Sequence, residues 1–187
     1  MGSSLPRTLG YEFLSTVDGA MQLAIEAHTG QFDKQGQPYI LHPMRVGASL
    51  WRFGDEAVIA GLIHDVVEDS DVTLLDLELW GASPAVVSAV ASVTKHASEA
   101  NWEAYEVSIR KAMSDPIGMW VKAADVADNA SRLDGIPWGS LRKRLEFKYE
   151  RAAALIASVI PGYRIGGALR PPGDILGELS DADFQDL

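Results

Sequence analysis

Four ionisable side chains recur at helical spacing in the stretch from residue 60 to residue 69. His64 and Glu68 are four residues apart, and so are Asp65 and Asp69, so one helix would display all four groups along one face. Imidazole and carboxylate groups bind divalent metals, and they are also common general acids and bases. A solvated acidic surface is the alternative interpretation, because acidic runs are usually exposed to water. The spacing therefore indicates either a catalytic metal site or a polar helix surface.

Two further candidate ligands lie outside this stretch. His42 comes directly before Pro43, and Asp125 lies in a later helical segment. A catalytic metal needs neutral imidazoles and ionised carboxylates that converge from different elements. The chain has no cysteine, which excludes disulfides, thiolate nucleophiles and cysteine-ligated metals. The candidate ligand set is therefore His42, His64, Asp65 and Asp125, in which the adjacent His-Asp pair can reach one ion because helical neighbours lie only about 100° apart.

Length and charge limit the classes of function. At 187 residues with 47% hydrophobic content, the chain is expected to fold as one domain with a sizeable core. No apolar run reaches membrane-spanning length, and the first ten residues lack the pattern of a signal peptide. A net charge of −10 repels nucleic acid polymers. We expect a cytoplasmic protein with a small-molecule substrate, no nucleic acid polymer and no membrane partner; the sequence predicts no oligomeric state.

Helical periodicity and helix-ending residues predict an all-α fold. His42 is expected at a helix entrance, because the residue before a proline is pushed out of the helical region. A loop is expected over residues 29–38, and the composition after residue 160 shifts to Gly, Pro and acidic residues. We therefore predict a domain over 1–160 and an extension over 161–187. The expected helices cover 11–28, 44–53, 55–69, 73–80, 84–95, 102–113, 116–133 and 141–160.

Several short sequence words, in this order, carry a resemblance to a known family. They are AHTGQ at 27–31, PYILHP at 38–43, HDVVED at 64–69, VTK at 93–95, and KAAD at 122–125 with Asn129. They resemble the hydrolase domain of RelA/SpoT homologues within the HD metal-dependent phosphohydrolase superfamily. At this length the chain is similar to the small alarmone hydrolases, over roughly residues 11 to 155.

The resemblance implies an HD-domain helical bundle with a metal site between helices and a defined reaction. The expected activity is a metal-dependent removal of the 3′-pyrophosphate of (p)ppGpp. The implied metal is one Mn²⁺, although two imidazoles and two carboxylates also suit Zn²⁺ and Fe²⁺. The implied roles are metal ligation by His42, His64, Asp65 and Asp125, catalysis by Glu68 and Asp69, and substrate binding by Lys34, Lys122, Asn129 and Arg132. For Lys122 and Asn129, a purely structural role is the alternative. His28 is expected to pack beside the loop and His96 to lie on the surface.

The chain departs from the family pattern where nucleotides are recognised. Asp33-Lys34 stands where an Arg-Lys pair is common, and Arg132 stands where a threonine is usual. The sequence at 125–129 is DVADN, where the family commonly has DRLHN. Adenine alarmones such as (p)ppApp are therefore candidate substrates beside (p)ppGpp. Two alternatives remain: a phosphohydrolase of another nucleotide phosphate, and a non-catalytic nucleotide-binding module, against which the presence of Glu68 and Asp69 counts.

Overall fold

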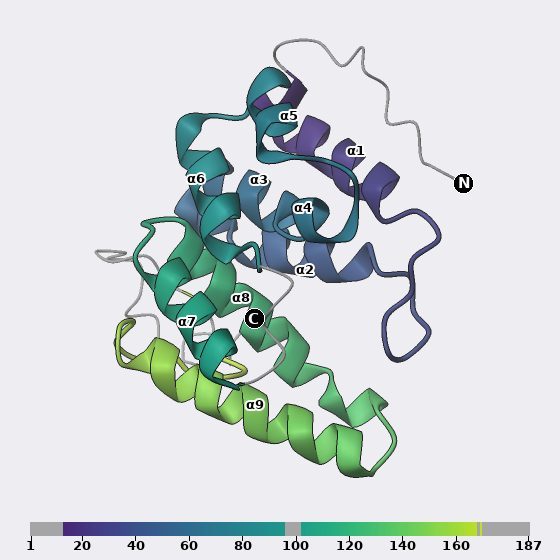
Figure 1. Ribbon diagram of the computed structural model, residues 1–187, viewed down its shortest axis with the longest axis vertical. Coiled ribbons are helices and arrows are strands. Elements are labelled where there is room, and N and C mark those ends of the chain that lie inside the picture. Colours follow the sequence, from purple (N-terminus) through teal and green to yellow (C-terminus); the bar gives the residue numbers. More distant parts are fainter. Residues whose placement is uncertain (1–12, 96–101, 168, 170–187) are drawn as a thin grey trace, which may run out of the picture.

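The computed structural model describes residues 13–95, 102–167 and 169, and all regular elements within these residues are helices (Figure 1). The all-α prediction is confirmed, and the loop before α2 contains an isolated bridge between Phe32 and Pro38. The helices are α1 Val17–Ala27, α2 Leu41–Ser49, α3 Asp55–Ile63, α4 Val66–Asp69, α5 Leu74–Leu79, α6 Pro84–Val93, α7 Trp102–Met113, α8 Gly118–Ser131 and α9 Ser140–Ala157. Short 3-10 turns cover Phe13–Ser15, Trp51–Phe53 and Leu133–Gly135.

Helix α3 lies at the centre of the fold because it is apolar on nearly every side. From Ala57 to Ile63 only Val58 is less than fully buried, and α1, α2, α6 and α8 all contact this helix. A helix that is hydrophobic around its whole circumference is stable only when other elements cover it. The end of α3 is therefore held rigidly in the interior, and the His64-Asp65 pair follows directly after it.

Two glycines bring α2 and α3 unusually close together. A Cβ atom added to Gly61 would lie 2.8 Å from Cδ1 of Leu50 and 3.1 Å from Cα of Gly47. A Cβ atom added to Gly47 would lie 2.7 Å from Cγ of Leu62. Only glycine at both positions permits this backbone approach. The crossing sets the separation between the start of α2 and the end of α3, which carry the candidate histidines.

Helix α8 joins two hydrophobic clusters. Its residues Val121 and Ala124 pack in the larger cluster with α1 to α6, while Ala123 and Val126 pack in a second cluster with α7 and α9. In Figure 1, α7, α8 and α9 lie side by side at the end of the molecule away from α1 and α5. The polar residues of α8 therefore lie between the two clusters.

The central helix differs from the prediction, because the structure breaks it at His64 and Asp65. The side chain of His64 donates from Nδ1 to the carbonyl of Gly61 at 2.8 Å. In a continuous helix that carbonyl would accept from the amide of Asp65, so the imidazole competes with the helical ladder. A separate one-turn helix, α4, follows and carries Glu68 and Asp69.

Two other helix starts also differ from the prediction. Helix α2 begins at Leu41, so His42 and Pro43 lie inside its first turn. The first turn leaves its amides without helical partners, so a proline there loses no hydrogen bond. Helix α1 begins at Val17, because Thr16 caps it by accepting from the amide of Gly19 at 3.1 Å. The remaining helices agree with the prediction to within about three residues.

The first part of the expected C-terminal extension packs against the bundle. Tyr163 is buried in the second cluster, and its hydroxyl donates to the carbonyl of Ala123 at 2.9 Å. The rest of the expected extension, apart from Leu169, lies outside the described residues, as does His96. Within the part of the chain that is described, no helix combines the length and apolar character needed to cross a bilayer.

Candidate metal and catalytic site

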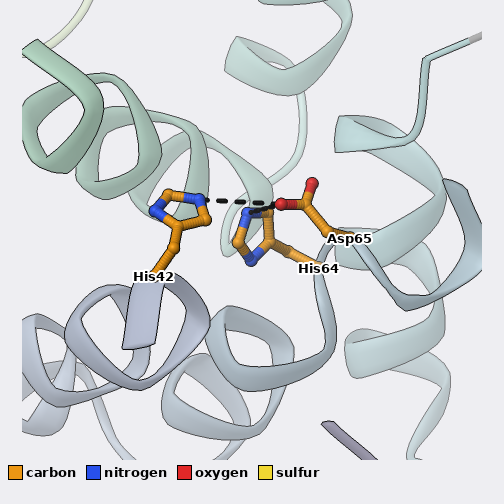
Figure 2. A group of neighbouring side chains, drawn as sticks. All are labelled: His42, His64 and Asp65. Atoms are coloured by element: carbon orange, nitrogen blue, oxygen red, sulfur yellow. Dashed lines mark ion pairs between the residues drawn. The ribbon is translucent and has the colours of Figure 1, made fainter. Parts of the chain in front are cut away.

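Three of the four predicted ligands converge between helices. Figure 2 shows His42 on α2 and the His64-Asp65 pair after α3, with their side chains pointing toward one another. One ligand atom from each residue lies within 4.8 Å of the other two. Oδ2 of Asp65 is 3.0 Å from Nε2 of His64 and 3.6 Å from Nε2 of His42. Two imidazoles and a carboxylate at these separations suit a divalent cation of the first transition series.

The orientation of His64 leaves one ring nitrogen unused. Its Nδ1 donates to Gly61, so in the neutral ring Nε2 carries the lone pair. Nε2 is buried and has no hydrogen-bond partner among the described residues. A buried polar atom without a partner is costly unless a ligand satisfies it. The structure therefore fits a metal at this position, and His64 has the carbonyl contact that commonly orients metal-binding histidines.

His42 is oriented by a carboxylate that the sequence analysis did not assign. Nδ1 of His42 donates to Oδ2 of Asp128 at 2.7 Å, which directs Nε2 toward Asp65. Asp128 is itself held by Arg45, whose Nε and Nη2 donate at 2.5 and 2.9 Å. Carboxylate partners of this kind orient metal-binding histidines. The available signal was the position of Asp128, three residues beyond Asp125 in the polar stripe of α8.

Asp125 lies beside this group of three and is held by its own helix. Oδ1 of Asp125 is 3.4 Å from Nε2 of His42. Lys122 donates from Nζ to Oδ2 at 2.8 Å, and Asn129 donates from Nδ2 to Oδ1 at 2.6 Å. The structure therefore shows Lys122 and Asn129 as partners of Asp125, and Lys122 is only 2% exposed. This network fixes the carboxylate at the edge of the three converging ligands.

The charges in the site favour a bound cation. Burial raises the pKa of Asp65, but the imidazoles of His64 and His42 together outweigh burial and hold that pKa well below its usual range. Burial likewise raises the pKa of Asp125, and the ammonium of Lys122 together with the same two imidazoles lowers it well below its usual range. Burial lowers the pKa of His42, yet contacts with Asp125 and Asp128 raise it to about 9. The carboxylates that attract a proton to His42 also attract a divalent cation, so proton and metal compete for Nε2.

The two predicted catalytic acids on α4 differ in their surroundings. Glu68 accepts from the amide of Lys95 at 2.6 Å and from its Nζ at 3.1 Å, so both carboxylate oxygens are held. No donor among the described residues bonds the side chain of Asp69. Partial burial, followed by the charge of Asp65, raises the pKa of Asp69. A carboxylate with a raised pKa beside a metal site is suited to proton transfer.

These groups, apart from His64, line one cavity of about 360 Å³. His42, Asp65, Asp125 and Asp69 form part of its polar wall, and Leu133, Ile136 and Leu145 form an apolar part. A cavity of this size with one apolar wall and convergent polar groups is typical of small-molecule sites. Lys34, Lys122, Asn129 and Arg132, the four residues predicted to bind substrate, also line it.

Asp33 is engaged by the loop itself. Its Oδ1 accepts from the amides of Gln35 and Gln37 at 2.8 and 2.9 Å, and its Oδ2 accepts from Arg132. The side chain of Gln35 also donates to the carbonyl of Arg132. The altered residues at positions 33 and 132 thus compensate each other as an ion pair that ties the loop to the end of α8.

His28 packs beside the same loop, as the sequence analysis expected. It is buried, its Nδ1 donates to Oε1 of Gln31 at 2.8 Å, and its ring lies 4.9 Å from that of Tyr39. Tyr39 in turn donates its hydroxyl to Oδ2 of Asp65 at 2.6 Å. Tyr39 therefore connects the loop to the candidate metal ligands, a role that the sequence analysis did not identify.

Known proteins with similar sequences act on guanosine nucleotides. A guanosine-3′,5′-bis(diphosphate) 3′-pyrophosphohydrolase of Haemophilus influenzae is 38% identical over 128 residues, covering 64% of this chain and 18% of that protein. The bifunctional (p)ppGpp synthase/hydrolase SpoT of Escherichia coli is 33% identical over 155 residues, covering 79% of this chain and 21% of that protein. The chain therefore spans about a fifth of the length of these relatives.

The fold is also similar to that of a solved structure. A metazoan orthologue of SpoT, described as hydrolysing ppGpp, aligns with a TM-score of 0.65 and 27% sequence identity. The alignment covers 80% of this chain and 88% of that chain. The family model of the HD domain matches residues 20–137, more than half of the sequence, and the chain therefore belongs to the HD domain family.

Proposed function

We propose that this protein is a metal-dependent pyrophosphohydrolase that removes the 3′-pyrophosphate of (p)ppGpp or of the adenine analogue (p)ppApp. The observation that carries the proposal is the convergence of His42, His64 and Asp65 beside a nucleotide-sized cavity, which His42 and Asp65 line. The orphaned Nε2 of His64 supports a metal there, and the sequence relatives support the substrate class.

We assign metal binding to His42, His64, Asp65 and Asp125, with Mn²⁺ as the expected ion. A divalent metal supplies activation of water and neutralisation of phosphate charge when it is bound. The residues of the chain supply the orientation: Asp128 and the Gly61 carbonyl each fix one imidazole, and Tyr39 fixes Asp65.

We assign the catalytic domain to residues 1–160 and the C-terminal extension to 161–187; the family match over 20–137 supports the first part.

We assign the proton transfers to Asp69 and the orientation of water to Glu68, the two acidic residues of α4. Water attacks the phosphorus bound to the 3′ oxygen, the bond between that phosphorus and O3′ breaks, and O3′ gains a proton. The products are pyrophosphate and the nucleoside 5′-diphosphate, or the 5′-triphosphate when the substrate carries three 5′ phosphates. Asp69, with its raised pKa and free carboxylate, accepts the proton of water and returns one to O3′. Glu68, held by Lys95, orients the water.

The loop and the apolar wall provide the site for the nucleoside. Leu133, Ile136 and Leu145 offer apolar area to a ribose or base, and Lys34 projects a cation from the loop. Because the carboxylate of Asp33 is occupied by Arg132, it is not available to accept from a base. Asp33 therefore does not select guanine over adenine, and both ppGpp and ppApp are included in the test.

The test is product analysis by anion-exchange chromatography. The purified protein is incubated with ppGpp and, separately, ppApp in the presence of Mn²⁺, with Zn²⁺, Fe²⁺ and a chelator in parallel reactions. We expect pyrophosphate together with GDP or ADP, and no product with the chelator. Absence of turnover of both nucleotides with every metal would overturn the proposal, and turnover of another nucleotide phosphate would indicate a different substrate.

The control variants separate metal loss from unfolding. Replacing Asp65 by alanine removes a carboxylate ligand, so we expect metal binding and turnover to be lost. Replacing Asp134 by asparagine changes a carboxylate whose side chain is 92% exposed, and should leave both unchanged. Full activity of the Asp65→Ala variant would contradict the assignment of the metal site.

A further inference from the structure

Not every lysine that lines the cavity is paired with one of its carboxylates. Four lysines line it: Lys34, Lys95, Lys122 and Lys148. Lys95 is paired with Glu68 at 3.1 Å, and Lys122 is paired with Asp125 at 2.8 Å. Lys148 makes no ion pair with a carboxylate among the residues that the structure describes. In a protein with a net charge of −10, a cation without a carboxylate partner inside this cavity indicates an anionic ligand.

Lys148 is held in position by aromatic rings. It lies on α9 three residues after Leu145, on the face of the helix that lines the cavity. Its Nζ is 3.9 Å from the ring centroid of Tyr105 on α7 and 5.6 Å from that of Tyr149. Contacts between a cation and an aromatic face fix the ammonium without cancelling its charge. The side chain is therefore ordered while its charge remains available.

The surroundings of Lys148 disfavour its charged ammonium form when no anion is bound. Burial, followed by the charges of Lys95 and Lys122, lowers the pKa of Lys148 to about 8. A charged group in such surroundings gains stabilisation when an anion approaches it. Phosphate is the anion that fits, since the proposed substrates bring several phosphate groups into this cavity and an ammonium binds phosphate as a point charge.

We propose that Lys148 anchors a second phosphate subsite, which binds the 5′-phosphates of the substrate while the 3′-pyrophosphate lies at the metal ligands. This inference rests on the proposed function and deepens it. Lys148 comes from α9, whereas the metal ligands come from α2, α8 and the link after α3, so the two subsites lie on different walls of the cavity. The preferred substrate class is then a nucleotide that is phosphorylated at both positions.

The experiment compares two substrates in two proteins. The substrates are ppGpp and guanosine 3′-diphosphate, which lacks the 5′-phosphates; the proteins are the wild type and Lys148→Met. Methionine keeps the length and apolar stem of lysine but removes the charge.

We expect the substitution to lower kcat/KM for ppGpp by about 10- to 100-fold, mainly through KM, because a charge-assisted contact to phosphate is lost. For guanosine 3′-diphosphate the change should stay below about 3-fold. Equal losses for both substrates, or no loss for ppGpp, would overturn the subsite.

Two controls test the position and the charge. Lys143→Met removes an exposed lysine of the same helix and should leave both substrates unaffected. Lys148→Arg keeps the positive charge and should recover most of the activity toward ppGpp.

Binding measurements keep the inference testable when turnover is absent. Isothermal titration with GDP and with guanosine, on wild type and on Lys148→Met, reports the 5′-phosphate contact without any reaction. We expect the substitution to weaken GDP binding by about 10-fold and to leave guanosine binding unchanged. A wild type that cleaves no 3′-pyrophosphate but shows this difference would contradict the proposed function alone. A wild type that cleaves ppGpp without this difference would contradict the subsite alone.

Discussion

Arg132, directly after α8, donates from Nη2 to Oδ2 of Asp33 in the loop before α2, at 2.9 Å. The two residues are 99 positions apart in the sequence, and their contact ties the loop to the rim of the cavity. Arg132 also donates to Oε1 of Gln35 at 3.2 Å. The two departures from the family pattern at these positions are therefore coupled, and a change at one leaves the other without its partner.

A double-mutant cycle on Asp33 and Arg132 measures this coupling. The variants are Asp33→Ala, Arg132→Ala and the double variant, and their free energies of unfolding come from urea titration. Because the pair is partly buried and supported by Gln35, we expect a coupling energy of about 1 kcal/mol. The matched control is the pair of Arg142 with the highly exposed Asp134, for which coupling should be close to zero. Strict additivity at positions 33 and 132 would show that the ion pair does not fasten the loop.

Replacement of Asp128 by asparagine should weaken metal binding without removing a ligand. The carboxylate accepts from Nδ1 of His42 and from Arg45, so its loss leaves the imidazole free to rotate or to change tautomer. We expect the affinity for Mn²⁺ to fall by about 10- to 100-fold. Isothermal titration measures this, and Asp134→Asn is the control for the loss of a carboxylate. Unchanged affinity in Asp128→Asn would mean that His42 does not need this partner.

The ionisation of Lys148 should appear in the pH dependence of stability. Its pKa is lowered from 10.5 to about 8 in the folded protein by burial and by neighbouring charges. Protonated Lys148 therefore opposes folding below pH 8, and this penalty is relieved as the pH rises from about 8 to 10.5, where the unfolded chain binds more protons. The charged or titratable groups around it are Tyr105 on α7, Lys122 and Asp125 on α8, Tyr149 on α9, Lys95 after α6, and Lys34 in the loop.

Variants at position 148 isolate this contribution. The free energy of unfolding of wild type minus that of Lys148→Met should increase between pH 8 and pH 10. The difference between Lys148→Arg and Lys148→Met should stay constant, because neither side chain loses a proton in that range. Urea unfolding at each pH provides both differences. A wild-type difference that is flat with pH would show that the ammonium of Lys148 is not disfavoured in the fold.

The candidate ligand residues were proposed from the sequence, whereas their hydrogen-bond partners were not. His64 and Asp65 are adjacent, and residue type and helical spacing alone suggested metal chemistry. The contact of His42 with Asp128 joins residues 86 positions apart, and its geometry depends on how α2 crosses α8. Periodicity also predicted the buried face of α3. It did not predict the break after Ile63, because that break comes from one imidazole competing for one carbonyl.

Lys148 illustrates the same limit. On the sequence it is one of several basic residues in the polar part of α9, and nothing in the local pattern separates it from Lys143. The difference arises only when α9 packs against α7 and α8, which brings Lys148 beside the ring of Tyr105 and into the cavity. Residue type and spacing therefore suggest candidate ligands, while the pairing of charges inside a cavity can be described only from the packed structure.

Replacement of Gly61 by alanine should disturb the fold and the metal site together. The added Cβ would lie 2.8 Å from Cδ1 of Leu50 and 3.1 Å from the backbone of Gly47, so α2 and α3 must move apart. Overpacking of this kind typically costs about 1 to 3 kcal/mol of stability. His42 lies on one of these helices and His64 directly follows the other, so we expect weaker Mn²⁺ binding as well. Gly139→Ala is the matched control, because its Cβ would meet nothing within 4 Å and its φ of 168° is extended. Thermal unfolding and isothermal titration measure the two effects. A Gly61→Ala variant that is destabilised but binds Mn²⁺ like the wild type would show that the helix crossing supports the fold and not the spacing of the ligands.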